Sequence, residues 1–158
     1  MKGDVTKPHT SPCIIPHVCN DIGKFGAGVA GAIAKKWPHI QKAYFDWSSR
    51  MKLGGDFYLG QIQICKAEDG IVVCNMIGQR DVGAGFHHIP PARLEAVDEC
   101  LYRLSLWLNI TQNKVNKEIS IIMPRICCGL GGQKWENIEP IIQKNLVISG
   151  FNVFIYDL

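Results

Sequence analysis

The feature that most constrains the fold of this chain is a unit of strand, glycine-rich loop and helix that occurs twice. The first unit runs from an apolar segment (Cys13–Cys19) through GKFGAG (Gly23–Gly28) into a segment of small residues (Ala27–Lys36). The second runs from a β-branched segment (Ile119–Met123) through CCGLGG (Cys127–Gly132) into an apolar-periodic segment (Trp135–Ile148). Glycines allow backbone N–H groups to face a ligand without a Cβ in the way. Because a helix N-terminus adds further unpaired donors, the two units predict paired anion sites suited to phosphate.

The remaining segments continue the alternation of strands and helices. Pro38 is expected to begin a second helix that runs through Trp47. Pro90-Pro91 is expected to begin a third helix, in which the apolar positions from Leu94 to Leu108 have helical spacing. Strands are expected at Gly60–Lys66 and Ile71–Ile77, joined by an Asp69-Gly70 hairpin turn, and at Phe151–Tyr156. This order predicts an α/β fold, a three-layer α/β/α sandwich with a mixed central sheet, formed by residues 1–158 as one domain.

Composition narrows the classes of partner. The net charge of +3 suits a site for a small anion. Aromatic residues are not interleaved with basic ones, as a base-stacking surface for nucleic acid requires, so we expect no nucleic-acid partner. The seven cysteines contain no CxxC spacing, which predicts buried free thiols in a reducing compartment and no metal site. With no signal peptide and no membrane-spanning run in the sequence, we expect a monomeric cytoplasmic protein, or a nuclear one in a eukaryote, without a cofactor.

Four polar residues near the loops are candidates for chemistry, each with a structural alternative. Asp4 has the chemistry to accept a hydrogen bond from an exocyclic amine, or to form an Asx turn. Asn20 and Asp21 stand before the first loop, where they would contact ribose hydroxyls, orient a water molecule or cap the chain locally. His17 lies in an apolar strand, where a histidine is more often part of the core.

The glycines also have a structural alternative. GKFGAG is neither a Walker A motif nor a Rossmann fingerprint. Gly26, Gly28 and Gly31 would then be helix-packing residues, and Gly129–Gly132 a plain turn. The spacing alone leaves both interpretations open.

Four segments resemble the macro domain family and fall in the order that the family has: GDVTKP (Gly3–Pro8), PHVCND to GKFGAGVA (Pro16–Ala30), MPRICCGLGGQKWENIEPII (Met123–Ile142) and IYDL (Ile155–Leu158). The resemblance spans the whole chain and is nearest to a subgroup with ADP-ribose 1″-phosphate phosphatase, a terminal ADP-ribose glycohydrolase and a reader module of a chromatin remodeller. It implies an ADP-ribose site in which Asp4 and Val5 contact the adenine and Asn20 the distal ribose. Backbone donors on one side of the diphosphate would come from Gly26, Ala27, Gly28 and Val29. The other side would be lined by Cys128, Gly129, Leu130, Gly131 and Gly132, with Tyr156 and Leu158 near the adenine.

The sequence departs from the family at three places. Only Met1 and Lys2 precede Gly3, so the first edge strand is expected to be short or absent. Gly131 stands near the place where the glycohydrolases carry an acid, and Gly78-Gln79-Arg80 where they carry a lysine, so their lysine–aspartate mechanism does not transfer. Two functions therefore stay open: hydrolysis at the distal ribose of an ADP-ribose derivative, with Asn20, Asp21 or His17 as catalytic residues, and reading of ADP-ribose or ADP-ribosylated protein without turnover.

Overall fold

The protein is built on one five-stranded sheet with the strand order β2-β3-β1-β4-β5. The computed structural model describes residues 1–50, 55–80, 90–129 and 131–157. β2 pairs antiparallel with β3, and the other neighbours are parallel, which confirms the mixed sheet. The strands are β1 (Cys13–Asn20), β2 (Ile62–Glu68), β3 (Ile71–Gln79), β4 (Ser120–Pro124) and β5 (Val153–Tyr156).

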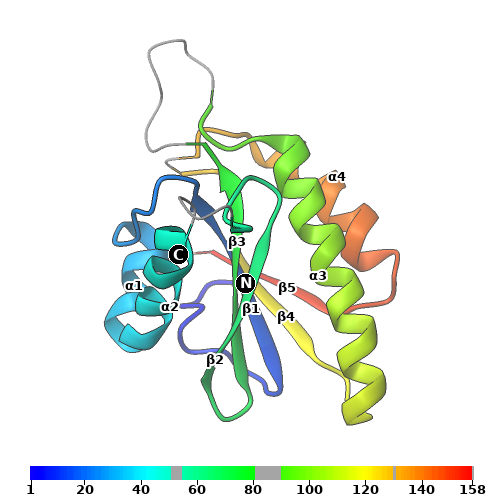
Figure 1. Cartoon of the computed structure of the whole chain (residues 1–158). Coiled ribbons are helices and arrows are strands. Elements are labelled where there is room, and N and C mark those ends of the chain that lie inside the picture. Colours follow the sequence, from blue (N-terminus) through cyan, green and yellow to red (C-terminus); the bar gives the residue numbers. More distant parts are fainter. Residues whose placement is uncertain (51–54, 81–89, 130, 158) are drawn as a thin grey trace.

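Helices cover both faces of this sheet, which gives the expected three layers (Figure 1). On one face lie α1 (Gly28–Lys36) and α2 (Pro38–Ser49), and on the other α3 (Leu94–Val115), α4 (Trp135–Ile142) and a π-helical turn, η2 (Gln143–Val147). The buried residues accordingly form two clusters, one between the sheet and each helical layer.

The central strand β1 feeds both clusters because its side chains alternate between the faces. Ile14 packs on the α3 and α4 side, and Cys13 and Ile15 pack on the α1 and α2 side. Both isoleucines are fully buried, and each such side chain contributes about 2 kcal/mol relative to exposure. Burial on both faces explains why CIIPHVC is almost wholly apolar.

The chain before the first loop forms a minimal edge to the sheet. Lys2 makes a parallel bridge to Asp157, and the Gly3 N–H donates to the Asp157 carbonyl at 2.9 Å. The expectation of a short edge strand is therefore confirmed. This bridge brings the segment that begins at Asp4 to the same edge of the sheet as the end of β5.

Two predicted helix boundaries were wrong. The Pro90-Pro91 pair does not begin α3, which starts at Leu94. The chain before Leu94 is instead extended along the end of β3. There the Arg80 N–H donates to the Pro91 carbonyl and the Arg93 N–H donates to the Gly78 carbonyl, both at 2.8 Å. The predicted Trp135–Ile148 helix is α-helical only to Ile142 and then widens into η2. Gly150 follows with a φ of +91°, the left-handed conformation expected of a residue after a helix.

Within the described part of the chain, none of the helices is long and apolar enough to cross a membrane. All seven cysteines are free thiols, five of them buried and Cys65 and Cys128 partly exposed. Among these same residues no cluster of histidine, cysteine or acidic side chains has the geometry of a metal site.

Candidate functional site

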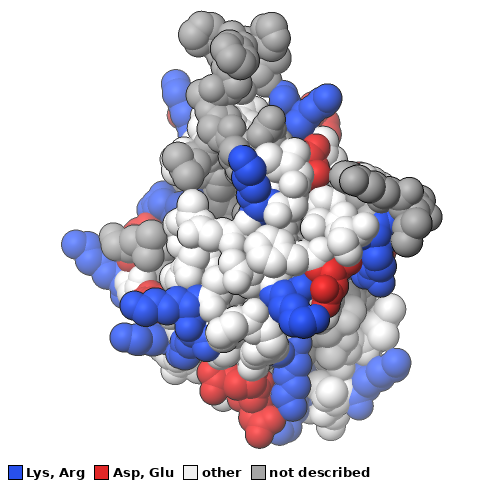
Figure 2. Space-filling model, turned by 60° about the vertical axis from the view of Figure 1, so that its left-hand side comes forward, with Lys and Arg blue, Asp and Glu red and all other residues white. Residues whose placement is uncertain are grey.

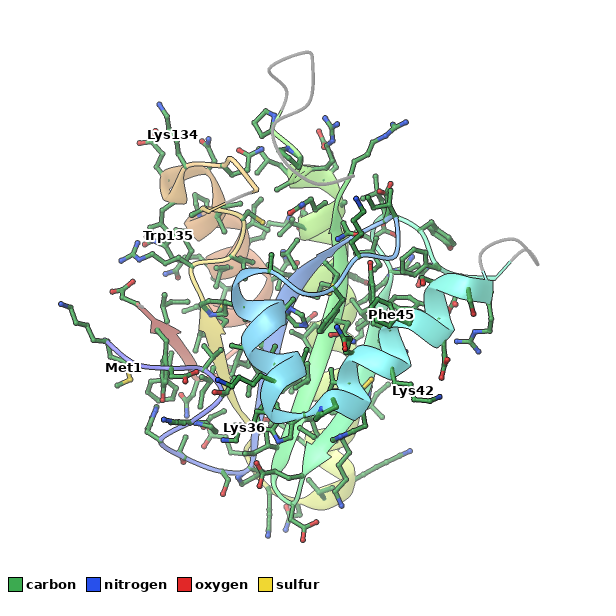
Figure 3. All side chains as sticks on the ribbon, turned by 90° about the vertical axis from the view of Figure 1, so that its left-hand side faces the viewer. Met1, Lys36, Lys42, Phe45, Lys134 and Trp135 are labelled. Atoms are coloured by element: carbon green, nitrogen blue, oxygen red, sulfur yellow. The ribbon has the colours of Figure 1, made fainter. Side chains whose placement is uncertain are left out.

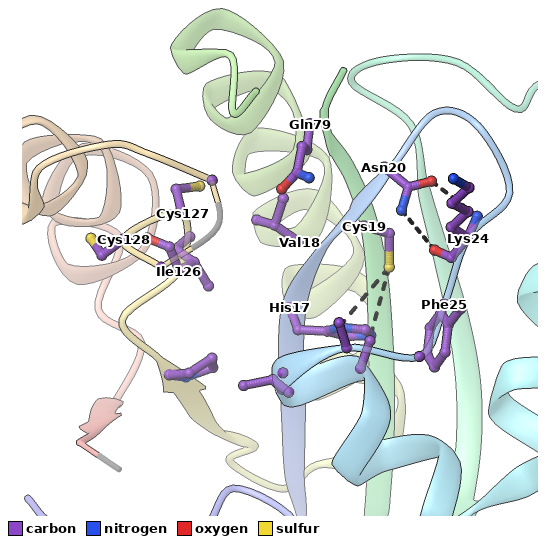
Figure 4. Close-up of a pocket in the computed structure, with 18 of the residues that line it drawn as sticks. His17, Val18, Cys19, Asn20, Lys24, Phe25, Gln79, Ile126, Cys127 and Cys128 are labelled. Atoms are coloured by element: carbon purple, nitrogen blue, oxygen red, sulfur yellow. Dashed lines mark hydrogen bonds between the residues drawn. The ribbon is translucent and has the colours of Figure 1, made fainter. Parts of the chain in front are cut away.

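A cavity of about 1020 Å³ lies at the carboxyl ends of β1 and β4, between the two glycine-rich loops. Figure 4 shows the Ile126–Cys128 segment on one side of β1 and the Lys24–Phe25 segment on the other. The carboxyl ends of parallel strands are where ligands bind in open α/β sheets. The described residues that line the cavity are His17–Asn20, Gly23–Ala30, Phe45, Gln79, Pro124–Gly129, Gly131, Tyr156 and Asp157.

The N-terminus of α1 opens into this cavity. Ala27 is its N-cap, with extended backbone and no side-chain capping bond, and the first turn contains no acidic residue. The first intrahelical bond of this turn joins the Gly31 N–H to the Ala27 carbonyl at 3.2 Å. The N–H groups of Gly28, Val29 and Ala30 thus have no partner within the helix and, with the positive end of the helix dipole, form a site for an anion.

The glycines of the first loop fall into two groups. A Cβ added at Gly26 or Gly28 would meet no atom within 4 Å, so both positions border open space. A Cβ at Gly31 would lie 2.7 Å from the Gly26 carbonyl oxygen, so Gly31 is required for packing. The structural alternative therefore holds for Gly31, whereas Gly26 and Gly28 leave room beside the helix N-terminus.

The second loop is folded tightly on itself. Cys127 adopts a left-handed φ of +68°, and its carbonyl accepts the Gln133 N–H at 2.8 Å. A Cβ at Gly131 would lie 2.8 Å from that carbonyl oxygen, which means that no side chain fits there without a shift of the backbone. Cys128, Gly129 and Gly131 line the cavity, Gly132 does not, and Leu130 lies outside the described residues. The sequence predicted that the N-terminus of the helix after this loop would contribute to the site. That helix, α4, begins at Trp135, which is not among the described residues that line the cavity. The N-terminus of α4 is therefore not part of the cavity wall.

Asn20 organises the first loop. Its Oδ1 accepts the N–H groups of Ile22 and Lys24, both at 3.1 Å, and the hydroxyl of Tyr44 at 2.9 Å. Its Nδ2 donates to the Lys24 carbonyl at 2.7 Å, the bond drawn in Figure 4. The local capping considered for Asn20 is therefore present. An amide nitrogen carries two hydrogens, so one donor remains beyond this bond in a side chain that lines the cavity.

His17 is held by a chain of hydrogen bonds that crosses three strands on the α1 and α2 face. Its Nε2 lies 2.6 Å from Asn75 Oδ1, Asn75 Nδ2 donates to Gln63 Oε1 at 2.9 Å, and Gln63 Nε2 donates to the Ala43 carbonyl of α2 at 3.0 Å. The registers make this possible, since Asn75 is paired with His17 in β1 and with Gln63 in β2. We call this chain of four groups the His17 relay.

The relay determines the protonation of His17. A carbonyl can only accept, so Gln63 must donate to Ala43, Asn75 must donate to Gln63, and Asn75 Oδ1 is left to accept from His17 Nε2–H. The second ring nitrogen, Nδ1, then carries a lone pair. Burial lowers the pKa of His17 to about 4, an effect that the bond to Asn75 partly offsets, so the ring is neutral at physiological pH.

The remaining predicted residues divide between the cavity and its borders. Tyr156 lines the cavity, and its hydroxyl accepts the His9 N–H at 3.0 Å. Asp4, Val5 and Asp21 are not among the described lining residues, and Leu158 lies outside the described part. Asp4 Oδ1 accepts the N–H and the hydroxyl of Thr6 at 2.8 and 2.7 Å, the Asx geometry considered for it, and these bonds hold the pKa of the carboxyl below its ordinary value.

Comparison with known proteins identifies the family. No protein-family model matches the chain. A macrodomain protein from Streptomyces coelicolor has the same fold, with a TM-score of 0.80 and 34% identity over 99% of this chain and 96% of that one. This chain belongs to the macro domain family.

Further relatives agree with this assignment. A protein of unknown function from Bacteroides thetaiotaomicron matches with a TM-score of 0.90 and 39% identity over 100% of this macro domain and 96% of that chain. The ADP-ribose 1″-phosphate phosphatase of Lodderomyces elongisporus is 25% identical over 99% of this chain and 97% of its own. A macrodomain mutant of Oceanobacillus iheyensis solved with ADPR shares the fold, with a TM-score of 0.63 and 23% identity over 99% of this chain and 82% of that one.

Lys24, Arg125 and Asp157 are the lysine, arginine and acidic residues among the described residues that line the cavity of this macro domain. The Arg125 guanidinium pairs with the Asp157 carboxylate and lies 4.9 Å from the Trp135 ring centroid. On the face shown in Figure 2, lysines and arginines are scattered around uncharged surface and do not form one basic stripe.

Sequence reasoning missed several lining residues. Phe25, Phe45 and Ile126 give the cavity apolar walls, and Phe45, on α2 in Figure 3, is 40% exposed. Gln79 lines the cavity in the region where the glycohydrolases carry a lysine. Phe25 lies within the first glycine-rich loop and Ile126 directly precedes the second, so the sequence contained a signal for these two lining residues. No signal in the sequence pointed to Phe45, which reaches the cavity from another helix.

Proposed function

We propose that this macro domain binds ADP-ribose, with the diphosphate between the α1 N-terminus and the Cys127–Gly131 loop. The observation that carries this proposal is the uncapped first turn of α1, whose three N–H donors border a cavity large enough for a nucleotide. Open space at Gly26, Gly28 and Gly129 supports close approach of a ligand to both loops. Macro domain relatives solved with ADPR support the choice of ligand.

In this proposal the ligand runs from the β5 edge of the sheet to β1. The adenine lies toward Asp4, Val5 and Tyr156 and the carboxyl end of the chain, as the family resemblance implies. Asp4 uses Oδ1 for both bonds to Thr6, which leaves Oδ2 as the acceptor for an exocyclic amine. The distal ribose lies toward Asn20, whose second Nδ2 hydrogen is the donor to a ribose hydroxyl.

We further propose that the bound derivative is hydrolysed at the distal ribose, as the relatives named ADP-ribose 1″-phosphate phosphatases suggest. For a 1″-phosphate the phosphate ester bond breaks, one water molecule is consumed, and ADP-ribose and inorganic phosphate are released. His17 is a better candidate than Asp21 for orienting that water, because His17 lines the cavity and its Nδ1 carries a lone pair. Acetyl and protein esters at the same ribose are alternative substrates.

A second candidate function is a reader that binds ADP-ribose without turnover. The observation that favours it is the Gly131 backbone, which has no space for the acidic residue that glycohydrolases carry nearby. Hydrolysis in this chain would then depend on His17, Asn20 and Asp21 alone. The two functions share the same binding site and differ only in the catalytic step.

The binding proposal is tested by calorimetry with ADP-ribose and ADP. We expect ADP-ribose to bind with a dissociation constant in roughly the micromolar range, about 8 kcal/mol, and ADP more weakly because it lacks the distal ribose. Gly26→Glu should abolish binding without unfolding the protein, since its φ is ordinary and its Cβ meets no neighbour within 4 Å. Lys35→Glu, in the last turn of the same helix, is the matched control and should bind normally. No heat with either ligand would overturn the proposal.

The hydrolysis proposal is tested separately on three derivatives. ADP-ribose 1″-phosphate, O-acetyl-ADP-ribose and a glutamyl-ADP-ribosylated protein are each incubated with the protein, and release of the leaving group is followed. We expect turnover of the 1″-phosphate and its loss in the Gly26→Glu variant. Normal binding of ADP-ribose with no turnover of any of the three, at high protein concentration, would leave the reader as the function.

A further inference from the structure

The outer face of α3 carries an apolar stripe. Tyr102, Leu106 and Ile110 are 47%, 49% and 58% exposed, four residues apart on a helix whose opposite side, from Val97 to Leu108, is buried in the core. The helix belongs to the α3 and α4 layer on one face of the sheet (Figure 1), and its buried side packs against that sheet. The leucine pattern in the sequence accounts for the buried side of α3 but not for this outer stripe.

The stripe extends along the whole helix as a mixed apolar and charged seam. Glu95, Glu99, Tyr102, Leu106, Ile110 and Asn113 are all exposed and follow one another at spacings of four, three, four, four and three residues. These spacings average close to the 3.6 residues of a helical turn, so the seam runs nearly parallel to the helix axis for about 27 Å from Glu95 to Asn113. A seam of this kind fits the shallow crossing of two helices packed along their length.

The exposed charges near the two ends of the seam differ: a glutamate stands at its start and two lysines stand beyond its end, with Glu118 beside them, while Glu99 is already paired with Arg103 at 2.6 Å. Glu95 lies in the first turn of α3, whereas Lys114 lies in the last turn and Lys117 just beyond it. A second α3 placed antiparallel, with a two-fold axis at Leu106, would bring Tyr102 opposite Ile110 and Glu95 near the two lysines. A parallel arrangement would instead place glutamate against glutamate and lysine against lysine.

We propose that the partner of this surface is a second copy of the chain, in an antiparallel α3–α3 dimer with Leu106 on the two-fold axis. A two-fold interface requires a patch that is complementary to itself, and the stripe meets this requirement both in its apolar centre and in its charges. One helix on each side makes a small interface, so we expect a weak dimer that forms only at high protein concentration. The protein would then be a dimer at high concentration, contrary to the monomer expected from the sequence.

Sedimentation velocity over a wide concentration range tests the proposal. The unmodified chain should pass from monomer to dimer as its concentration rises, and Leu106→Glu, which sets two carboxylates against each other on the axis, should weaken the dimer more than tenfold. Ile148→Glu places the same charge at a residue that is 80% exposed but outside α3, and should dimerise normally. Circular dichroism and ADP-ribose binding should be unchanged in both variants.

Charge reversal tests the antiparallel orientation. Glu95→Lys alone should weaken the dimer about threefold, and adding Lys114→Glu and Lys117→Glu should restore it, because the opposed charges are then exchanged. A chain that stays monomeric at the highest concentration would overturn the proposal and leave the stripe to another protein. A dimer that persists in Leu106→Glu, or one that the triple reversal does not restore, would overturn it as well.

Discussion

Acidification should destabilise this macro domain through His17 at a pH where carboxylates are still ionised. The folded-state pKa of His17, about 4, lies below the value of about 6.5 for an unfolded histidine. The unfolded chain therefore binds the extra proton first as the pH falls. The stabilisation from neutral His17 is fully present above about pH 6.5 and is lost progressively as the pH falls toward 4.

The magnitude follows from the two pKa values. Each unit of pKa difference corresponds to about 1.4 kcal/mol, and between about pH 7.5 and 4.5 the free energy of unfolding should fall by about 2.5 kcal/mol because of this group. His17 is only 2% exposed, so solvent does little to screen this effect. About half of the loss should have occurred by pH 5.5.

Urea denaturation of the unmodified chain and of His17→Gln at pH 7.5, 5.5 and 4.5 measures this effect. A glutamine at 17 offers Asn75 an N–H donor of similar reach but does not titrate, so its unfolding free energy should change far less over the same range. His39→Gln is the matched control, because His39 is exposed and its ring forms a hydrogen bond to the Lys66 carbonyl at 3.0 Å. Equal pH dependence in the unmodified chain and in His17→Gln would refute the reasoning.

Three further predictions concern the loops and the chemistry. Tyr44→Phe removes a hydroxyl that donates to the carbonyl oxygen and to Oδ1 of Asn20, at 2.8 and 2.9 Å. Denaturation should show that the free energy of unfolding falls by about 1 kcal/mol, and calorimetry should show a severalfold weaker affinity for ADP-ribose. Gly131→Asp should weaken ADP-ribose binding at least tenfold, because its Cβ would meet the Cys127 carbonyl; a gain of hydrolysis in this variant would contradict the loop geometry. Asp21→Ala and Asn20→Ala should be compared by their kcat and KM on whichever derivative is turned over. Loss of a residue that orients water should lower kcat by about a hundredfold or more. Loss of a residue that only binds the substrate should raise KM and leave kcat unchanged.

The strands and the first glycine loop could be predicted because their causes are local. A strand buried on both faces, such as β1, must be almost wholly apolar, and Gly70 marks a hairpin whatever the rest of the chain does. The start of α3 could not be predicted in the same way. The Pro91–Arg93 segment is extended because it bonds to the end of β3, and a proline pair is equally compatible with a helix start.

The candidate site shows the same division. The loops were identified from glycine spacing, but the environment of His17 depends on the pairing of three strands from distant parts of the sequence. Nothing near His17 in the sequence indicates Asn75 or Gln63 as its partners. The distinction between Gly31, which is required for packing, and Gly26, which is not, also depends on where the neighbouring carbonyl lies.

The position of β1 at the centre of the sheet has a consequence for synthesis of the protein. β1 is the first strand made, yet its two neighbours, β3 and β4, follow only about 50 and 100 residues later. On the ribosome, a nascent chain that ends before β4 therefore carries an apolar strand with at least one unpaired edge. Parallel pairing over such sequence separations is slow, so we expect this macro domain to complete its fold only after most of the chain has emerged, with newly made chains more prone to aggregate than the native protein.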